Sequence, residues 1–210
     1  MRFGVNTAAH YKSLDASAKQ LLSYICAFIM LYNIKQLYTP ALEAYEFNER
    51  ALIVDTETIG AGAGIEIIEI AIADTAGNVV YDSLVQPVFN RLPPPSKHKR
   101  FDKAELASAP QWTEVWPEIQ ALIDGKLLIA YNASFDRRAL AATCSRYRQV
   151  STERGWRCAM HLIKKATGAK RALTLDEACA RYGLCGGTHR ALADVLATWR
   201  LLKAVTANAV

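Results

Sequence analysis

Short apolar segments rich in β-branched residues recur along the chain after residue 50, each bounded by polar or turn-forming residues. This pattern is typical of buried strands. We predict strands at Ala51–Val54, Ile65–Ala73, Val79–Val85, Lys126–Tyr131 and Trp156–Met160. The first three follow one another closely, with turn-forming residues at 74–78, so we expect them to be antiparallel neighbours.

Longer segments with a helical apolar pattern follow the first strands. We predict helices at Trp112–Ile123, Asp136–Tyr147, Leu175–Tyr182 and Ala191–Val205. The Pro- and Lys-rich residues 91–100 should form an exposed loop. Three strands, and then strands alternating with helices, predict an α/β domain with a mixed sheet covered by helices.

Residues 1–48 have a different pattern, which predicts a helical N-terminal extension ahead of a main domain at 49–210. Leu21–Ile34 is apolar, but it is shorter than the run of about 20 residues that a membrane-spanning helix needs. No small-residue cleavage site of a signal peptide follows it. We interpret it as a buried or partner-facing helix, with a membrane-surface helix as the alternative, and we expect no membrane span.

Composition and charge fit an ordinary globular protein, with 210 residues, 51% hydrophobic and 21% charged. The net charge of +5 favours a polyanionic partner such as nucleic acid, although an unspecialised basic surface explains it equally well. The five cysteines are odd in number and form no CxxC pair, so we expect free thiols and a reducing, cytoplasmic location. They are Cys26, Cys144, Cys158, Cys179 and Cys185.

The first candidate for chemistry is the sequence Asp55-Thr56-Glu57-Thr58, which directly follows the first predicted strand. Residues i and i+2 of an extended chain point to the same side, so the carboxylates of Asp55 and Glu57 should share one face. Two carboxylates held together are costly unless a cation neutralises them. Alone, this motif is equally typical of a solvated strand end.

Two further motifs lie at element boundaries. Asn132 precedes Asp136 by four residues, between a predicted strand and the helix that follows it. His189 precedes Asp194 by five residues and follows a Gly-Gly pair. Five residues apart on one helix, these two side chains would lie about 140° apart, so they can share a site only if His189 is still in the loop. Taken singly, Asp136 also suits a helix start and His189 an exposed loop.

Together, the motifs place four carboxylates and one histidine where they can face a single cleft. Open α/β sheets bind ligands at the carboxyl ends of their strands. Carboxylates without clustered Cys or His ligands suit hard divalent cations, Mg²⁺ or Mn²⁺. Two such ions about 3.5–4 Å apart can act on the attacking and leaving oxygens of a phosphoryl transfer.

These motifs resemble those of the DEDD exonuclease superfamily, in particular its DEDDh branch, which includes the proofreading subunit of bacterial DNA polymerase III, ribonuclease T and oligoribonuclease. The DxE, Asn-x3-Asp and His-x4-Asp motifs of that branch match Asp55-Thr56-Glu57, Asn132 to Asp136 and His189 to Asp194. The resemblance covers about residues 52–202, so it places an exonuclease domain at 49–210.

The resemblance implies a ribonuclease H-like fold and the release of nucleoside 5′-monophosphates from a 3′ end. It implies that His189 deprotonates the attacking water, a task that suits an imidazole near neutral pH. Glu69 is not a ligand in this picture and is interpreted as structural, or at most as a residue that supports a metal ligand. The implied ligands of two Mg²⁺ or Mn²⁺ ions are Asp55, Glu57, Asp136 and Asp194.

Substrate contacts are expected at Thr56, Thr58, Ile59 and Asn132. Family members often have Gly directly after the second Thr, whereas here Ile59 intervenes, and it is placed to wedge against the terminal base. Single strands favour basic grooves with stacking aromatics. Basic residues that could hold the strand are Lys97, Lys99, Arg100, Arg137, Arg138, Lys164 and Lys165.

The leading functional interpretation is a 3′→5′ exonuclease acting on single-stranded or frayed DNA ends. The alternatives are an exoribonuclease or short-oligonucleotide degrader, and a non-catalytic module that binds nucleic acid or docks on a polymerase. A role in proofreading or DNA repair would require a partner, because the sequence has no polymerase segment. The apolar helix expected within residues 1–48 is the candidate docking element.

Overall fold

The computed structural model describes residues 47–88 and 101–207. Its centre is a five-stranded mixed sheet with the strand order β3-β2-β1-β4-β5. Strand β1 pairs antiparallel with β2 and parallel with β4. The other two pairings are antiparallel for β2 and β3, and parallel for β4 and β5. The strands are β1 (Ala51–Ile59), β2 (Glu66–Asp74), β3 (Val79–Leu84), β4 (Leu127–Ala130) and β5 (Gly155–Cys158).

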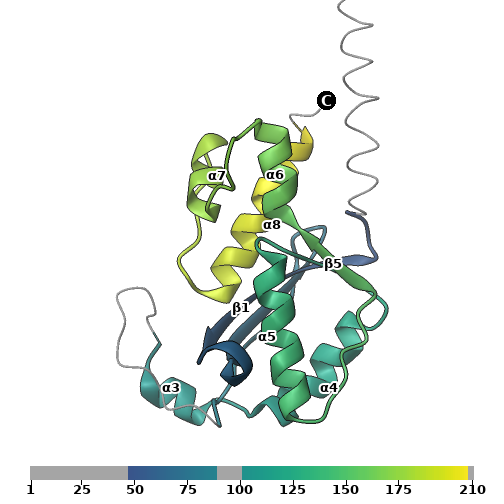
Figure 1. The fold of residues 1–210 in the computed structure, drawn as a ribbon, viewed down its shortest axis with the longest axis vertical. Coiled ribbons are helices and arrows are strands. Elements are labelled where there is room, and N and C mark those ends of the chain that lie inside the picture. The colour runs from purple at the N-terminus through teal and green to yellow at the C-terminus, as the bar shows by residue number, and fades with distance from the viewer. Residues whose placement is uncertain (1–46, 89–100, 208–210) are drawn as a thin grey trace, which may run out of the picture. The chain divides into compact units, whose positions relative to one another are not determined.

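Helices precede, separate and follow the last two strands (Figure 1). They are α3 (Lys103–Ser108), α4 (Trp112–Ile123), α5 (Ala133–Arg146), α6 (Ala159–Thr167), α7 (Leu175–Arg181) and α8 (Ala191–Ala207), and a short 3₁₀ turn, η1 (Gly62–Gly64), links β1 to β2. Strands followed by helices, with parallel β1, β4 and β5, are the ribonuclease H-like arrangement that the sequence predicted.

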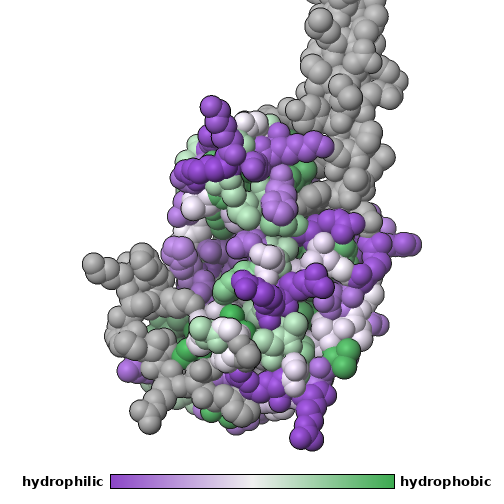
Figure 2. Space-filling view, viewed as in Figure 1, coloured by the Kyte–Doolittle hydropathy of each residue, from purple (hydrophilic) through white to green (hydrophobic). Residues whose placement is uncertain are grey.

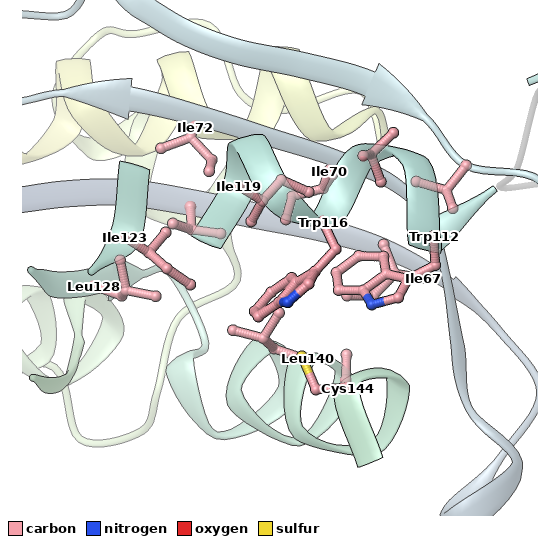
Figure 3. Packing of buried hydrophobic residues seen from close by; sticks show 14 of the residues in the cluster. Ile67, Ile70, Ile72, Trp112, Trp116, Ile119, Ile123, Leu128, Leu140 and Cys144 are labelled. Atoms are coloured by element: carbon pink, nitrogen blue, oxygen red, sulfur yellow. The ribbon is translucent and has the colours of Figure 1, made fainter. Parts of the chain in front are cut away.

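The main hydrophobic core lies between one face of the sheet and helices α4 and α5. Figure 3 shows Trp112 and Trp116 of α4 above Leu140 of α5, with the ring centroids of the two tryptophans 5.3 Å apart. Leu52 and Val54 of β1 belong to the same cluster of buried residues. The odd-numbered residues of β1 therefore point to the opposite face of the sheet, because neighbouring strand residues alternate in direction. Helix α8 packs along β1 and β2.

Most predicted elements are confirmed, with three corrections. Strand β1 continues through the acidic motif to Ile59, because β2 pairs with it along that length. Helix α5 begins at Ala133, three residues earlier than predicted. The predicted strand Trp156–Met160 was wrong at its end, because the chain enters helix α6 at Ala159 and buries Leu162 and Ile163. The short helix α3 was not predicted.

The predicted helical extension and the loop at residues 91–100 lie outside the described residues. Within the ranges 47–88 and 101–207, none of the helices is long and apolar enough to cross a membrane. In those ranges four of the five cysteines form no disulfide bond, in agreement with the prediction: Cys144, Cys158, Cys179 and Cys185.

Candidate active site

The candidate active site is a pocket of about 180 Å³ at the end of the sheet where β1 extends past its parallel neighbour β4. The last paired residues of these two strands are Ile53 and Ile129, so the β1 residues after this point are free of β4 on that side. Four acidic residues line the pocket, as predicted: Asp55, Glu57, Asp136 and Asp194. The predicted substrate contacts Thr56 and Asn132 also line it.

Asp136 is fixed by two hydrogen bonds from one residue of β1. The backbone N–H and the hydroxyl of Thr56 both donate to Oδ1 of Asp136, at 3.0 and 2.9 Å. Asp136 lies in the first turn of α5, where the helix dipole favours a negative charge. The Asp136 side chain is therefore held in one orientation at the wall of the pocket. Thr56 therefore positions a carboxylate, in addition to its predicted place beside the substrate.

The loop before α8 holds His189 and Asp194 together. The backbone N–H of Thr188 donates to Oδ1 of Asp194 at 2.9 Å, and that of Gly187 donates to Asp176 at 2.9 Å. A Cβ atom at Gly187 would overlap the Asp194 carboxylate, so a larger residue here would displace that side chain. His189 has a φ of +57°, a conformation that is uncommon outside glycine and concentrated at functional sites.

This loop brings three potential ligands into one cluster. Ligand atoms of Glu57, His189 and Asp194 all lie within 4.8 Å of one another. His189 is exposed, whereas the two acids are partly buried. The expectation that His189 lies in the loop rather than in the helix is confirmed, since α8 begins at Ala191. The histidine therefore shares the site with Asp194 despite their five-residue separation.

The electrostatics of the pocket are unfavourable for several negative charges. Burial raises the pKa of Asp55 well above its ordinary value, and the charges of Asp136 and Asp194 raise it further. Burial raises the pKa of Asp136 to about 7, although the two hydrogen bonds from Thr56 oppose this shift. Burial also raises the pKa of Asp194. Such a concentration of raised carboxylate pKa values in a pocket is typical of a functional site or a cation site.

Glu69 has a structural role, as the sequence analysis proposed. Its Oε1 accepts a hydrogen bond from Nε of Arg190 at 2.8 Å, and its Oε2 accepts one from the backbone N–H of Ala191 at 2.9 Å. Nη2 of Arg190 lies 2.7 Å from Oε1 of the same carboxylate, and the guanidinium stacks over the ring of Phe101, 5.1 Å from its centroid. Glu69 thus anchors the start of α8 to β2.

Two of the expected substrate contacts lie away from the pocket. Thr58 is buried and does not line it. Ile59 is buried against Ile68 and Leu106, in a small hydrophobic cluster. Its use as a wedge against a base remains a prediction, and it would require movement out of that cluster. A hydrophobic residue after a strand is ambiguous in sequence, since it suits a small core as well as a base contact.

Sequence reasoning did not assign three residues that line the pocket, namely Tyr131, Phe135 and Leu175. The hydroxyl of Tyr131 donates to the carbonyl oxygens of Leu173 and Thr174, at 2.8 and 2.9 Å. These bonds connect the end of β4 to the start of α7. Tyr131 and Phe135 could have been assigned to the pocket from the sequence, because they lie on either side of Asn132. Nothing in the sequence placed Leu175 beside the acids.

The fold and the carboxylate pocket define a nuclease of the ribonuclease H-like class. Residues 52–202 match the RNase T exonuclease family, so the chain belongs to this family of 3′→5′ exonucleases. It is also 30% identical, over 173 residues, to the uncharacterized exonuclease CP81 of Escherichia phage 186, which covers 73% of this chain and 87% of that protein. The resemblance to the DEDD exonucleases is thereby confirmed.

Solved structures show the same fold at low sequence identity. A full-length 3′-exonuclease matches with a TM-score of 0.58 at 15% identity. The match covers 75% of this chain and only 60% of that protein. The nuclease domain of 3′hExo, a DEDDh family member bound to rAMP, has a TM-score of 0.59 at 15% identity, covering 75% of this chain and 92% of that one. S. pombe Pop2p, with Mg²⁺ and Mn²⁺ bound, has a TM-score of 0.56 at 13% identity, covering 82% and 88%.

Proposed function

We propose that this protein is a metal-dependent exonuclease that hydrolyses single-stranded or frayed DNA from the 3′ end and releases nucleoside 5′-monophosphates. The observation that carries the proposal is the assembly of the acidic pocket. Acidic residues of β1, α5 and α8 converge in one small cavity. The most distant of them, Asp55 and Asp194, lie 139 positions apart in the sequence. His189 joins the same cluster.

The donor set fits divalent cations. Carboxylate oxygens are the preferred ligands of Mg²⁺ and Mn²⁺. Burial, and the charges of neighbouring acids after it, raise the pKa values of Asp55 and Asp136, and a bound cation would offset both effects. In a two-ion arrangement, the cations supply charge neutralisation to the attacking and leaving oxygens of the phosphate. We assign the four carboxylates as the metal ligands: Asp55, Glu57, Asp136 and Asp194.

His189 is assigned as the general base. It is exposed, and ligand atoms of Glu57 and Asp194 lie within 4.8 Å of its imidazole, where these carboxylates can orient it. A neutral imidazole accepts the proton of the attacking water, and the neighbouring carboxylates stabilise the imidazolium that results. Its backbone conformation and the hydrogen bond from Thr188 to Asp194 keep this loop in place before substrate arrives.

The test is digestion of 5′-labelled DNA and RNA oligonucleotides with Mg²⁺, with EDTA, and with two variants. We expect Mg²⁺-dependent shortening that EDTA and Asp55→Ala abolish. His189→Ala should lower kcat strongly while Mg²⁺ binding, measured by calorimetry, is retained. Metal-independent cleavage, or none on either polymer, would refute the proposal. Faster digestion of RNA than DNA would favour the exoribonuclease alternative, because that choice depends on recognition of the 2′-hydroxyl.

A non-catalytic binding module is the alternative from a different class. The convergence of all four acids in one pocket, with His189 grouped beside two of them, argues against it. We also propose that a polymerase or another protein docks on residues 1–48. A role in proofreading or repair and a cytoplasmic location are likewise proposals. Deletion of residues 1–48 should leave the nuclease activity largely intact if that segment serves only to dock a partner.

A further inference from the structure

A second pocket of about 370 Å³, here called the basic pocket, lies between α5, β5 and α6. Its volume falls within the range of roughly 300–1,000 Å³ that is typical of ligand sites. Within residues 47–88 and 101–207, no acidic residue lines it. Its charged and aromatic lining consists of Arg137, Trp156, Arg157 and His161.

The basic pocket and the active site share the first turns of α5. Asn132, Phe135 and Asp136 line the active site, whereas Ala133, Ser134 and Arg137 line the basic pocket. Positions three and four apart on a helix lie on the same side, so each set occupies its own face of α5. The two pockets are therefore neighbours across a single helix. In Figure 2, which has the same view as Figure 1, hydrophilic and less polar residues are interspersed over the region of α5.

The charges of the two pockets are opposite. The active site is lined by carboxylates and repels a phosphate unless cations are present. The basic pocket presents Arg137 and Arg157 close to the N-termini of α5 and α6, where helix dipoles also favour anions. Guanidinium groups match phosphate geometry well. The basic pocket would therefore attract a polyanionic strand, whereas the active site without cations would not.

Trp156 supplies a fixed aromatic surface in the basic pocket. Its indole Nε1 donates to Oε1 of Glu153 at 2.8 Å, and the ring packs partly against the main core. Nη1 of Arg157 donates to the carbonyl oxygen of Trp156 at 3.2 Å. The ring is therefore held before any ligand binds, and its remaining surface lines the pocket. Stacking of a base on such a ring needs no particular base identity.

We propose that the basic pocket is a subsite for a nucleotide of the substrate strand, on the 5′ side of the scissile phosphate, with its base on Trp156 and its phosphate between Arg137 and Arg157. This inference rests on the proposed function of the acidic pocket. The scissile phosphate must lie at the carboxylates, where Phe135 and Leu175 offer apolar surface to the terminal nucleoside. The strand then crosses α5, and the next pocket that it meets is the basic one.

The test compares a long substrate with a minimal one. The p-nitrophenyl ester of thymidine 5′-monophosphate occupies only the acidic pocket, whereas a 5′-labelled ten-nucleotide DNA strand reaches both pockets. Trp156→Ala should lower kcat/KM for the strand by about 5- to 100-fold, the range expected for loss of one stacked base, mainly through KM. The ester should react at the wild-type rate. Trp156→Phe should retain most of the activity on the strand, because a smaller ring still stacks.

A binding measurement makes the test independent of catalysis. Fluorescence anisotropy of the same strand in EDTA should show weaker binding by the Arg137→Gln/Arg157→Gln variant. Its slope of log affinity against log salt should be smaller by about 0.7 for each phosphate that the variant no longer neutralises. Lys203→Gln, which removes one exposed charge on α8 outside both pockets, should resemble the wild type.

Three outcomes overturn the subsite. They are unchanged strand affinity in the double arginine variant, an equal loss on the ester and the strand in Trp156→Ala, and a loss of strand activity in Trp156→Phe as large as that in Trp156→Ala. A wild-type protein that cleaves neither substrate would instead refute the proposed nuclease function. The anisotropy measurement would still decide whether the basic pocket binds a strand.

Discussion

Thr56 donates two hydrogen bonds, from its backbone N–H and its hydroxyl, to the same oxygen of Asp136. The two residues lie 80 positions apart in the sequence. This pair of bonds joins β1, which carries two of the acids, to α5, which carries the third. The pair therefore fixes the position of one acid of the pocket relative to the two acids of β1.

Thr56→Val should therefore lower activity without unfolding the protein. The variant retains the backbone donor and the side-chain shape but loses the hydroxyl bond to Asp136. Loss of a hydrogen bond that orients a metal ligand typically costs about 10- to 100-fold in metal affinity or activity. We expect a loss near tenfold in kcat/KM, measured by oligonucleotide digestion at several Mg²⁺ concentrations.

Thr198→Val on α8 is the matched control. The hydroxyl of Thr198 is buried and has no hydrogen-bond partner in the described part of the chain, so its replacement by a methyl group should keep the activity and maintain or increase the Tm. Equal activity of the two variants would contradict the orienting role of Thr56.

Gly187→Ala should disrupt the loop that carries His189. The added methyl group would overlap the Asp194 carboxylate, and that group cannot move without losing its bond from Thr188. We expect activity to fall at least tenfold, about 1.4 kcal/mol of transition-state stabilisation, while the circular dichroism spectrum is retained. Gly64→Ala, where a methyl group meets open space, is the control. An active Gly187→Ala enzyme would show that the loop rearranges freely.

Glu69→Gln should separate a structural acid from a metal ligand. This change removes the ion pair with Arg190 and weakens the bond to the backbone N–H of Ala191, so the free energy of unfolding should fall by about 1–3 kcal/mol. Calorimetry should still show Mg²⁺ binding. Asp55→Asn should have the opposite profile, with Mg²⁺ binding lost and the fold kept. Loss of Mg²⁺ binding in Glu69→Gln at full stability would make Glu69 a ligand.

The metal-free protein should lose stability as the pH rises. An unfolded aspartate has a pKa of about 3.9, whereas burial raises that of Asp136 to about 7 and that of Asp55 well above its ordinary value. The folded protein therefore binds more protons than the unfolded chain between about pH 4 and 7, and stability falls as these protons are released.

Thermal unfolding in EDTA at pH 5 and pH 8 measures this effect. The Tm should be higher at pH 5, and Asp136→Asn should reduce the difference. Mg²⁺ should raise the Tm at pH 8 much more than at pH 5, because its ligands must be deprotonated. If the Tm in EDTA changed between pH 5 and pH 8 by the same amount in the wild type and in Asp136→Asn, the raised pKa values would be contradicted.

The sequence predicted the acidic site well because its geometry follows from local rules. Alternation along a strand placed Asp55 and Glu57 on one side, and the Gly-Gly pair placed His189 outside α8. The helices with strong apolar periodicity were also predicted, including α4 with its buried tryptophans. In each case the signal lay within a few residues of the feature that it described.

Features set by distant contacts were not predictable in the same way. The acidic motif looked like the end of a strand, but pairing with β2 extends β1 to Ile59. The basic pocket depends on Arg137 and Trp156, which meet only because β5 lies beside β4 and places its residues near the start of α5. The bonds of Thr56 and Tyr131 likewise join segments that are far apart in sequence.

The most direct test of the central claim uses one single-stranded DNA in a 5′-labelled linear form and, in parallel, the same sequence as a covalently closed circle. With Mg²⁺, the protein should shorten the linear strand one nucleotide at a time while the label stays on the shrinking product, and it should leave the circle intact. Cleavage of the circle, or release of the labelled nucleotide as the first product, would contradict a 3′→5′ exonuclease.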